Sequence, residues 1–344
     1  MRTKLIALFL VIASPFVMFS CNFGNRVKTK EYYDLFNTVT TVQSYAGDTK
    51  REFSSVCDTV YSILSEYHKL FDIYHEYSGI NNIATINRLA GKESVTVSDK
   101  LIDFLLYAKE MHELTGGKTN VAIGALTSLW HDKREDAKEE GAIPSLPDTE
   151  SLTKAKDHIS IDNLVIDREN SVVFISDPEA SLDVGAIAKG YAVEMARRAL
   201  EASGVSGYVI NAGGNICAVG EKPSGEGWLT SIRNPHGEGY SASFFIKDIC
   251  CVTSGNYERY YTVGGVRYHH IIDETTLFPA DYCSSVTVFS ENSALADALS
   301  TALFLMDIEM GRALVSALPG VEVLWITDTG EVIMTDGLKN IQVQ

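Results

Sequence analysis

Apolar residues recur along this chain at two spacings, and each spacing predicts one kind of element. Residues 53–74 place apolar side chains three or four positions apart, which is the period of an amphipathic helix. Residues 37–45 alternate and are rich in Val and Thr, which is typical of a strand. We also predict helices at 98–114, 149–156, 187–203 and 294–306, strands at 164–167, 171–174, 207–211 and within 228–288, and a final hairpin at 321–334.

Helices and strands are interspersed without a strict strand–helix–strand repeat, which predicts an α+β fold. With 344 residues, of which 45% are hydrophobic, the chain can bury one large core, or two lobes packed as one. Residues 132–147 are charged and end near Gly and Pro, so we expect a surface excursion there and little chemistry. We find no internal sequence repeat and no Pro/Gly/Ser-rich linker after the N-terminal segment.

The N-terminus has the pattern of an export segment. Arg2 and Lys4 precede residues 5–19, which are nearly all apolar but too few for a comfortable membrane span. Ser20 and Cys21 follow, as at a bacterial lipoprotein cleavage site. We therefore expect a signal peptide at 1–20, a lipidated Cys21 with a tether through residue 30, and one folded domain from 31 to 344. The alternative is an ordinary signal peptide with an incidental cysteine.

Charge and cysteine content narrow the possible functions. The formal net charge of −16 argues against nucleic-acid binding, which needs clustered Lys and Arg. A bound divalent cation would still allow a phosphate-bearing ligand. Besides Cys21 the chain has five cysteines without metal-ligand spacing, and we expect all five to be buried thiols. They are Cys57, Cys217, Cys250, Cys251 and Cys283.

Two glycine-containing turns could approach a ligand closely. The segment SLDVGAIAKGYA (181–192) leads through Gly185 directly into a helix, and a helix start offers free N–H groups to a phosphate. Lys189 would add a point charge and Gly190 would allow close backbone approach. The segment NAGGN (211–215) ends a buried strand. The plain alternatives are an ordinary helix start and a tight turn.

The segment ALADALSTALF (294–304) places Asp297 and Thr301 four residues apart, on one face of a predicted helix. A carboxylate and a hydroxyl on an otherwise apolar helix are unfavourable to bury without a partner, and a hard cation such as Mg²⁺ would satisfy both. Alternatively, Thr301 donates back to the Asp297 carbonyl, as mid-helix threonines do.

Adjacent histidines follow in RYHHIID (267–273), after TSGNYERY (253–260). Neighbouring residues of a strand point to opposite faces, so at most one of His269 and His270 lines a given cleft. With Asp273 nearby, an imidazole could be oriented as a general base. The alternative is a histidine with a purely structural role.

In this order, the segments resemble the ApbE family of FAD:protein FMN transferases. The resemblance extends from residue 37 to the final hairpin. The residues that carry it are GKTNVAIGALTSLW (117–130), SLDVGAIAKGYA (181–192), INAGGN (210–215), TSGNYERY (253–260), RYHHIID (267–273) and ADALSTALF (296–304). It implies a single α+β domain of two related halves around a central FAD cleft.

The resemblance also implies roles for individual residues. Asp297 and Thr301 would bind Mg²⁺ with the main-chain oxygen of Ala186. His270 matches the catalytic histidine, because it directly precedes Ile-Ile-Asp. The residues expected to contact FAD are Asn81, Asn82, Asn120, Lys189 and Ile272.

The chain departs from the family pattern around the flavin. Asn120 stands where many members have Asp, and Asn256 stands where the motif TSGD is common. Glu274 and Leu277 replace the Pro and Gly of a DPxTG motif, and the loop 79–84 is longer than usual. These departures affect the flavin contacts more than the metal site, where ADALST is intact.

The implied reaction transfers FMN from FAD to a Ser or Thr of an exported or membrane electron-transfer flavoprotein and releases AMP, with Mg²⁺ as cofactor. One alternative is an FAD pyrophosphatase that uses water, and a second is an FAD-binding lipoprotein without turnover. A generic solute-binding lipoprotein would predict two hinged lobes and no metal dependence. We expect the protein on the extracytoplasmic face of a bacterial membrane, held by lipid.

Overall fold

The computed structural model describes residues 27–44, 50–222 and 224–343. The expected signal peptide and Cys21 lie outside the described residues. In the part of the chain that is described, no helix has the length and apolar character needed to cross a membrane. Strand β1 (Lys28–Leu35) already belongs to the main sheet, so the folded part begins inside the segment expected to be a tether.

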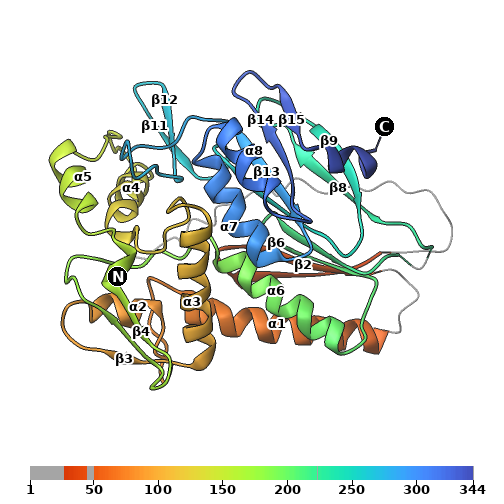
Figure 1. Cartoon of the computed structure of the whole chain (residues 1–344), viewed down its shortest axis with the longest axis horizontal. Coiled ribbons are helices and arrows are strands. Elements are labelled where there is room, and N and C mark those ends of the chain that lie inside the picture. The colour runs from red at the N-terminus through yellow and green to blue at the C-terminus, as the bar shows by residue number, and fades with distance from the viewer. Residues whose placement is uncertain (1–26, 45–49, 223, 344) are drawn as a thin grey trace, which may run out of the picture.

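An eight-stranded sheet forms the centre of the molecule, in the order β1-β2-β6-β7-β10-β13-β14-β15, with all neighbours antiparallel (Figure 1). This order joins strands that are far apart in the sequence, because β2 pairs with β6 and β7 pairs with β10. The strands after β1 are β2 (Thr38–Ser44), β6 (Tyr208–Ala212), β7 (Asn215–Val219), β10 (Cys250–Gly255), β13 (Ser285–Ser290), β14 (Glu322–Ile326) and β15 (Val332–Met334).

Three helices pack against one another and the sheet: α1 (Lys50–Phe71), α6 (Ala188–Ala202) and α7 (Ser293–Phe304). Figure 1 shows α1 and α6 side by side, with α7 next to them. Val56, Val60 and Leu64 bury one face of α1, as the predicted period requires. Helix α7 contributes to two hydrophobic clusters and contacts β10 and β13, because its small apolar residues allow it to be buried on nearly all sides.

Smaller elements surround this core. Three short strands pair in the order β3-β5-β4, and two hairpins, β8–β9 and β11–β12, stand outside the main sheet. The helices are α2 (Ile83–Arg88), α3 (Asp99–Leu114), α4 (Gly124–Asp136), α5 (Thr149–Lys156) and α8 (Ile308–Ser316), with 3₁₀ turns at Ile161–Asn163 and Asp336–Asn340. The strands are β3 (Val95–Thr96), β4 (Leu164–Asp167), β5 (Val172–Ile175), β8 (Trp228–Arg233), β9 (Tyr240–Ile246), β11 (Tyr260–Val263) and β12 (Val266–His269).

The predicted α+β class is confirmed, and most predicted elements lie within a few residues of the observed ones. Ser98 caps α3 by accepting from the Leu101 N–H. The prediction of a surface excursion at 132–147 is wrong for its first residues, because α4 continues through Asp136 before the chain leaves regular structure.

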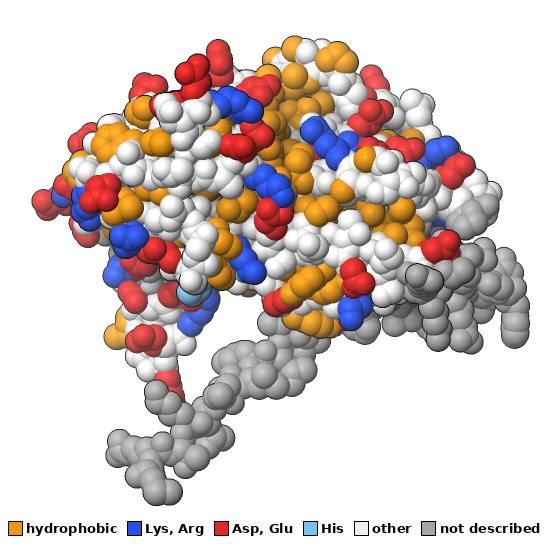
Figure 2. Space-filling view, turned by 90° about the horizontal axis from the view of Figure 1, so that it is seen from below, with side chains coloured by type: hydrophobic (Ala, Val, Ile, Leu, Met, Phe, Trp, Pro, Cys, Tyr) orange, Lys and Arg blue, Asp and Glu red, His pale blue; other side chains and the backbone are white. Residues whose placement is uncertain are grey.

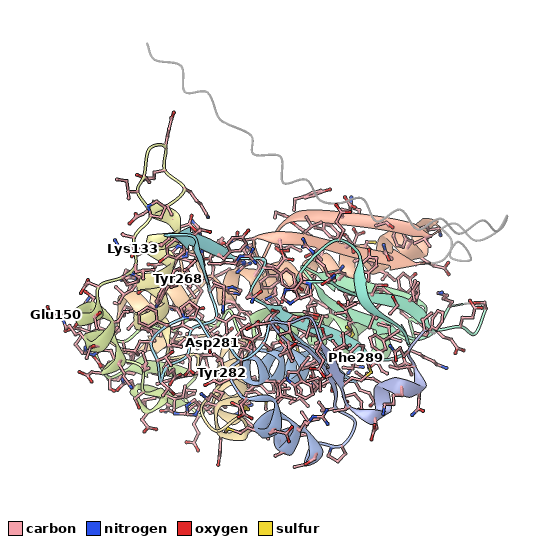
Figure 3. The ribbon with its side chains drawn as sticks, turned by 90° about the horizontal axis from the view of Figure 1, so that it is seen from above. Lys133, Glu150, Tyr268, Asp281, Tyr282 and Phe289 are labelled. Carbon is pink, nitrogen blue, oxygen red and sulfur yellow. A yellow bond between two sulfur atoms is a disulfide. The ribbon has the colours of Figure 1, made fainter. Side chains whose placement is uncertain are left out.

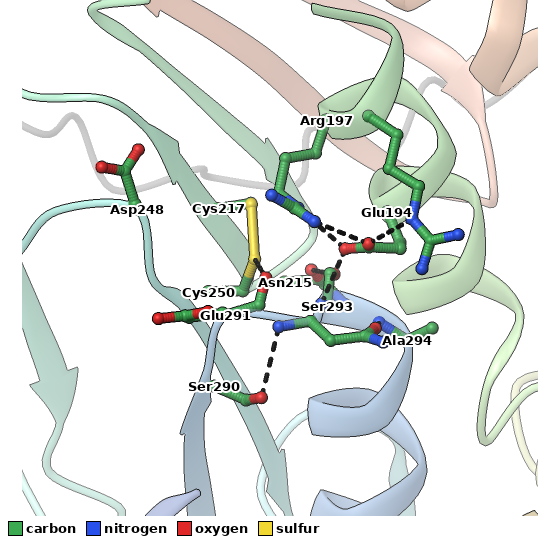
Figure 4. Close-up of a disulfide and its surroundings, with 12 residues drawn as sticks. Glu194, Arg197, Asn215, Cys217, Asp248, Cys250, Ser290, Glu291, Ser293 and Ala294 are labelled. Carbon is green, nitrogen blue, oxygen red and sulfur yellow. Dashed lines mark hydrogen bonds and ion pairs between the residues drawn. A yellow bond between two sulfur atoms is a disulfide. The ribbon is translucent and has the colours of Figure 1, made fainter. Parts of the chain in front are cut away.

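The cysteine prediction is partly wrong. Cys217 and Cys250 lie directly opposite each other in the β7–β10 ladder and form a disulfide (Figure 4). The remaining described cysteines, Cys57, Cys251 and Cys283, are buried free thiols, as expected. Five cysteines without a diagnostic spacing do not reveal a pairing that strand register creates.

Surface charges of both signs are mixed, and some of them are paired. Figure 2 shows acidic and basic side chains interspersed with apolar ones over the face seen from below. Many form exposed pairs, such as Arg88 with Glu76 and Lys100 with Glu66, each at 2.6 Å. Such pairs contribute little stability.

Candidate active site

The N-terminus of α6 is capped by a carboxylate from another helix. The Ile187 side chain at the helix start forms no capping hydrogen bond. Instead, the Gly190 N–H donates to Asp297 Oδ2 on α7 at 2.6 Å. First-turn N–H groups lack partners within their helix and carry partial positive charge, so they stabilise a buried carboxylate. Asp297 therefore ties α6 to α7.

Gly190 makes this contact possible. A Cβ at this position would lie 2.3 Å from Asp297 Cβ and 2.5 Å from the Ser293 carbonyl oxygen. The close backbone approach predicted for Gly190 thus exists, and its partner is α7. A larger residue would force the two helices apart.

Asp297 has the environment of a cation ligand. Burial raises the pKa of its carboxyl group, while the Lys189 charge and the Gly190 N–H lower it. Among the described residues, none donates a hydrogen bond to Asp297 Oδ1. A buried carboxylate with a free oxygen is stabilised by a hard cation.

Two further oxygens fit such a cation. The Ala186 carbonyl accepts no hydrogen bond from a described residue. Thr301 Oγ1 has only a long contact, 3.4 Å, with Ser254 Oγ. The back-bond to the Asp297 carbonyl comes from Ser300 Oγ at 2.9 Å, so the alternative considered for Thr301 is not observed. In the described ranges, no group of three or more His, Cys, Asp or Glu residues is arranged to hold a metal ion, so a cation here would depend on main-chain and hydroxyl oxygens as well.

The adjacent histidines lie in different environments. His269 ends β12, where its Nε2 lies 2.8 Å from the Ala280 carbonyl oxygen and its Nδ1 accepts from the Ile271 N–H at 3.3 Å. It therefore has a structural role. His270 Nδ1 is buried and has no hydrogen-bond partner in the described part of the chain. Burial, followed by nearby positive charges, lowers the pKa of His270 to about 3, so its ring is neutral at physiological pH.

Lys189 connects the two parts of the site. Its charge lowers the pKa of Asp297 and also that of His270, so the ammonium group lies within electrostatic reach of both. The start of α6, the Asp297 carboxylate and the His270 imidazole therefore border one site.

Asp273 does not orient this imidazole. Its Oδ1 accepts from the Thr275 N–H at 2.9 Å, its Oδ2 accepts from the Tyr282 hydroxyl at 3.3 Å, and Lys118 Nζ lies 3.6 Å from Oδ1. Of the described residues, neither histidine forms a hydrogen bond with it. The prediction that Asp273 assists a general base is therefore corrected: this carboxylate fixes the turn that follows β12.

Asn120 is held by protein groups on both sides. Its Nδ2 donates to Glu274 Oε1 at 2.8 Å and to the Ile159 carbonyl at 2.9 Å, and its Oδ1 accepts from the Ala122 N–H at 2.9 Å. Burial raises the pKa of Glu274, and the hydrogen bond from Asn120 opposes this shift. Two positions at which the chain departs from the family pattern thus contact each other.

Asn81 and Asn82 differ in whether their side chains have hydrogen-bonding groups left for a ligand. Asn82 caps α2, and its side chain accepts from Thr85 and donates to the Lys69 and His75 carbonyls. The Asn82 side chain thus has all its donors and acceptors engaged by the protein, and a contact of Asn82 with FAD stays a prediction that would involve its main chain. Asn81 is exposed and donates only to a main-chain carbonyl of β3, at 2.8 Å, which leaves its Oδ1 free.

Ile272 is buried in a cluster with Leu126 and Trp130 of α4. It lies on the segment between His270 and the Asp273 turn. Its side chain supports this wall of the site from within the core, so any contact with a ligand would involve its main chain.

Helix α4 supplies neighbours that the sequence reasoning missed. Arg134 Nη2 lies 2.8 Å from His131 Nδ1, and the Tyr74 and His131 rings are 5.3 Å apart. Trp130 stacks on Tyr268 of β12. Figure 3 labels Tyr268 next to Lys133 of α4. Arg134 also acts on the pKa of His270. Arg134, which belongs to the segment expected to be charged surface, therefore lies within electrostatic reach of His270.

A lysine at a helix start, a buried carboxylate with an open oxygen and an unpartnered histidine define a site for an anionic, phosphate-bearing ligand and a hard cation. Comparison with known proteins agrees with this class. The model of the ApbE family matches residues 36–325, and the chain belongs to the ApbE family.

Relatives match over most of their length. The chain is 31% identical over 322 residues to the FAD:protein FMN transferase of Treponema pallidum, covering 88% of this chain and 86% of that protein. It is 29% identical over 284 residues to the Klebsiella pneumoniae protein of the same name, covering 82% and 85%. The ApbE protein of Thermotoga maritima superposes with a TM-score of 0.80 at 27% identity, covering 93% of this chain and all of that structure. The Vibrio cholerae flavin transferase ApbE gives 0.76 at 25% identity, with 92% and 100% coverage.

Proposed function

We propose that the chain is an FAD:protein FMN transferase, which moves FMN from FAD to a Ser or Thr hydroxyl of an acceptor protein. Family membership and the shared name of its relatives support this activity. The observation that carries it is the unpartnered Nδ1 of His270, which lies in the same site as Lys189 and Asp297.

The main-chain N–H and the ammonium group of Lys189, at the start of α6, bind the FAD pyrophosphate. The oxygens of Ala186, Asp297 and Thr301 would hold Mg²⁺, which when bound neutralises charge on the phosphates. Asp297 also fixes α6 relative to α7, so the same side chain positions the anion-binding and cation-binding groups.

His270 takes the proton from the acceptor hydroxyl. The hydroxyl oxygen then forms a bond to the FMN-side phosphorus, and the bond from that phosphorus to the bridging oxygen breaks. AMP leaves with the electron pair of that bond, and FMN remains attached through a phosphoester. A neutral imidazole is required for the first step, and His270 is neutral before substrate binds.

The same site with water as nucleophile would hydrolyse FAD to FMN and AMP. We expect AMP release from FAD to be slow for the protein alone and to rise on addition of an acceptor flavoprotein domain with an accessible Ser or Thr. Chromatography of AMP measures both rates. Equal release with and without acceptor would identify a pyrophosphatase, and no release with FAD bound would identify a binding protein.

We also propose that Cys21 carries lipid and holds the protein on the extracytoplasmic face of the membrane, near exported or membrane electron-transfer flavoproteins as acceptors. The Cys217–Cys250 disulfide supports an oxidising compartment. Cys21→Ala should move the protein from the membrane fraction to the soluble fraction. An unchanged membrane-bound form of the same size would contradict lipidation.

A further inference from the structure

Arg259 lies across a hairpin from His270. In the β11–β12 pair, Tyr260 is opposite His269, and these two residues end the ladder. Arg259 and His270 each lie one residue beyond this pair, and after burial the charge of Arg259 is the largest cause of the lowered pKa of His270. The two residues therefore lie near each other at this end of the hairpin.

Arg259 has no acidic partner. It forms no ion pair and no side-chain hydrogen bond with any residue in the described ranges. The neighbouring acid, Glu258, is already bound by Arg233 at 3.0 Å.

Two more cations face the same imidazole, and we call Arg134, Lys189 and Arg259 the cationic cluster. They come from α4, the start of α6 and the turn before β11. Burial is the largest cause of the lowered pKa of His270. The electrostatic effects of Arg259, His269, Arg134 and Lys189 follow, from larger to smaller. Acidic residues near the cluster are Glu135, 3.6 Å from Arg134 Nε, and Asp297, whose pKa the Lys189 charge lowers. Three cations beside a buried, unpartnered nitrogen indicate a site for an anion supplied from outside the chain.

We propose that Arg259 is a positioning residue that, with Arg134 and Lys189, holds the reacting phosphate of the pyrophosphate substrate against His270. This inference rests on the proposed function and adds a residue to it. The guanidinium provides two parallel N–H donors, which suit a phosphate better than an ammonium does.

The cluster also links substrate binding to base strength. With no anion bound, the three cations oppose protonation of His270. A bound phosphate offsets their charge, so the pKa of His270 rises and the imidazole becomes a stronger base when the substrate is in place.

The test compares Arg259→Gln and Arg259→Lys with Arg267→Gln, an exposed arginine on the other strand of the same hairpin. For FMN transfer, Arg259→Gln should lower kcat/KM about 10- to 100-fold, Arg259→Lys should recover part of it, and Arg267→Gln should match the wild type. The acidic limb of the kcat/KM–pH profile should move to higher pH in Arg259→Gln, because one cation no longer opposes protonation of His270. Equal rates and profiles for Arg259→Gln and Arg267→Gln would overturn the inference.

A binding experiment separates this inference from the transferase activity. In NMR titrations with inorganic pyrophosphate and no metal, the His270 imidazole resonances should shift in the wild type and in Arg267→Gln, and should need at least several-fold more pyrophosphate in Arg259→Gln. Equal affinity in all three proteins would overturn the role of Arg259. Arg259-dependent binding without FMN transfer to any acceptor would instead refute the proposed function and leave the anion site standing.

Discussion

Asn120 and Glu274 are 154 residues apart in the sequence and are joined by a 2.8 Å hydrogen bond beside the candidate active site. The amide donates to a carboxylate whose pKa is raised by burial. A carboxylate at position 120 could not donate a hydrogen bond to Glu274, and when both groups are ionised they would repel each other. The Asn at position 120 and the Glu at position 274 therefore form a matched pair.

Asn120→Asp should destabilise the protein by about 1–3 kcal/mol at pH 7, because it replaces a donor with a like charge. A carboxyl group whose pKa is raised in the fold stabilises the fold below its unfolded pKa, near 4.5 for Glu, and loses this contribution as the pH rises. The destabilisation should therefore shrink as the pH is lowered from 8 toward 5. Urea unfolding across this range measures it.

The double variant Asn120→Asp/Glu274→Gln provides the control, because the glutamine amide can donate to the new carboxylate. It should recover most of the lost free energy of unfolding. A loss in the single variant that is independent of pH, or no recovery in the double variant, would show that charge repulsion is not the cause.

Gly190→Ala should destabilise the protein by about 1–3 kcal/mol, since its Cβ would meet the Ser293 carbonyl and Asp297 Cβ. Because the capping bond to Asp297 would also be displaced, transfer activity should fall in the same variant. Gly237→Ala is the matched control, with nothing closer than 3.5 Å to its added Cβ. Thermal unfolding of both variants tests this, and equal melting temperatures would contradict the close packing of α6 on α7.

Periodicity predicted the main helices and strands, because their buried faces follow from local sequence. It missed β1, an edge strand whose residues Lys28 to Asp34 are mostly polar, and it missed α4 because charged residues follow Trp130. Asp297, Thr301 and His270 were found from motifs. The cap on Gly190, the Asn120–Glu274 bond and the position of Arg259 depend on contacts between distant segments, which no local pattern reveals.

His270→Ala should stop FMN transfer while FAD affinity, measured by fluorescence titration, changes little. His269→Ala should leave the Ala280 carbonyl without its partner and lower the free energy of unfolding by about 1–3 kcal/mol, yet retain transfer when folded. If His269→Ala stops transfer and His270→Ala does not, the assignment of the two rings is reversed.

Reduction of the Cys217–Cys250 disulfide should lower the free energy of unfolding by about 2–4 kcal/mol, because it closes a loop with a sequence separation of 33. Denaturant unfolding with and without reductant measures this loss. The double variant Cys217→Ser/Cys250→Ser keeps the three buried thiols and should be insensitive to reductant. A wild-type protein that is equally insensitive would show that the bridge does not form in solution.

The intact mass of an acceptor protein shows directly whether FMN is transferred to it. A small exported flavoprotein domain with an accessible Ser or Thr is mixed with residues 22–344, FAD and Mg²⁺, with and without EDTA. The account predicts that the acceptor gains the mass of one FMN residue, that AMP appears in equal amount, and that EDTA prevents both. Conversion of FAD to FMN and AMP in the presence of an unmodified acceptor would contradict the transferase and identify a pyrophosphatase.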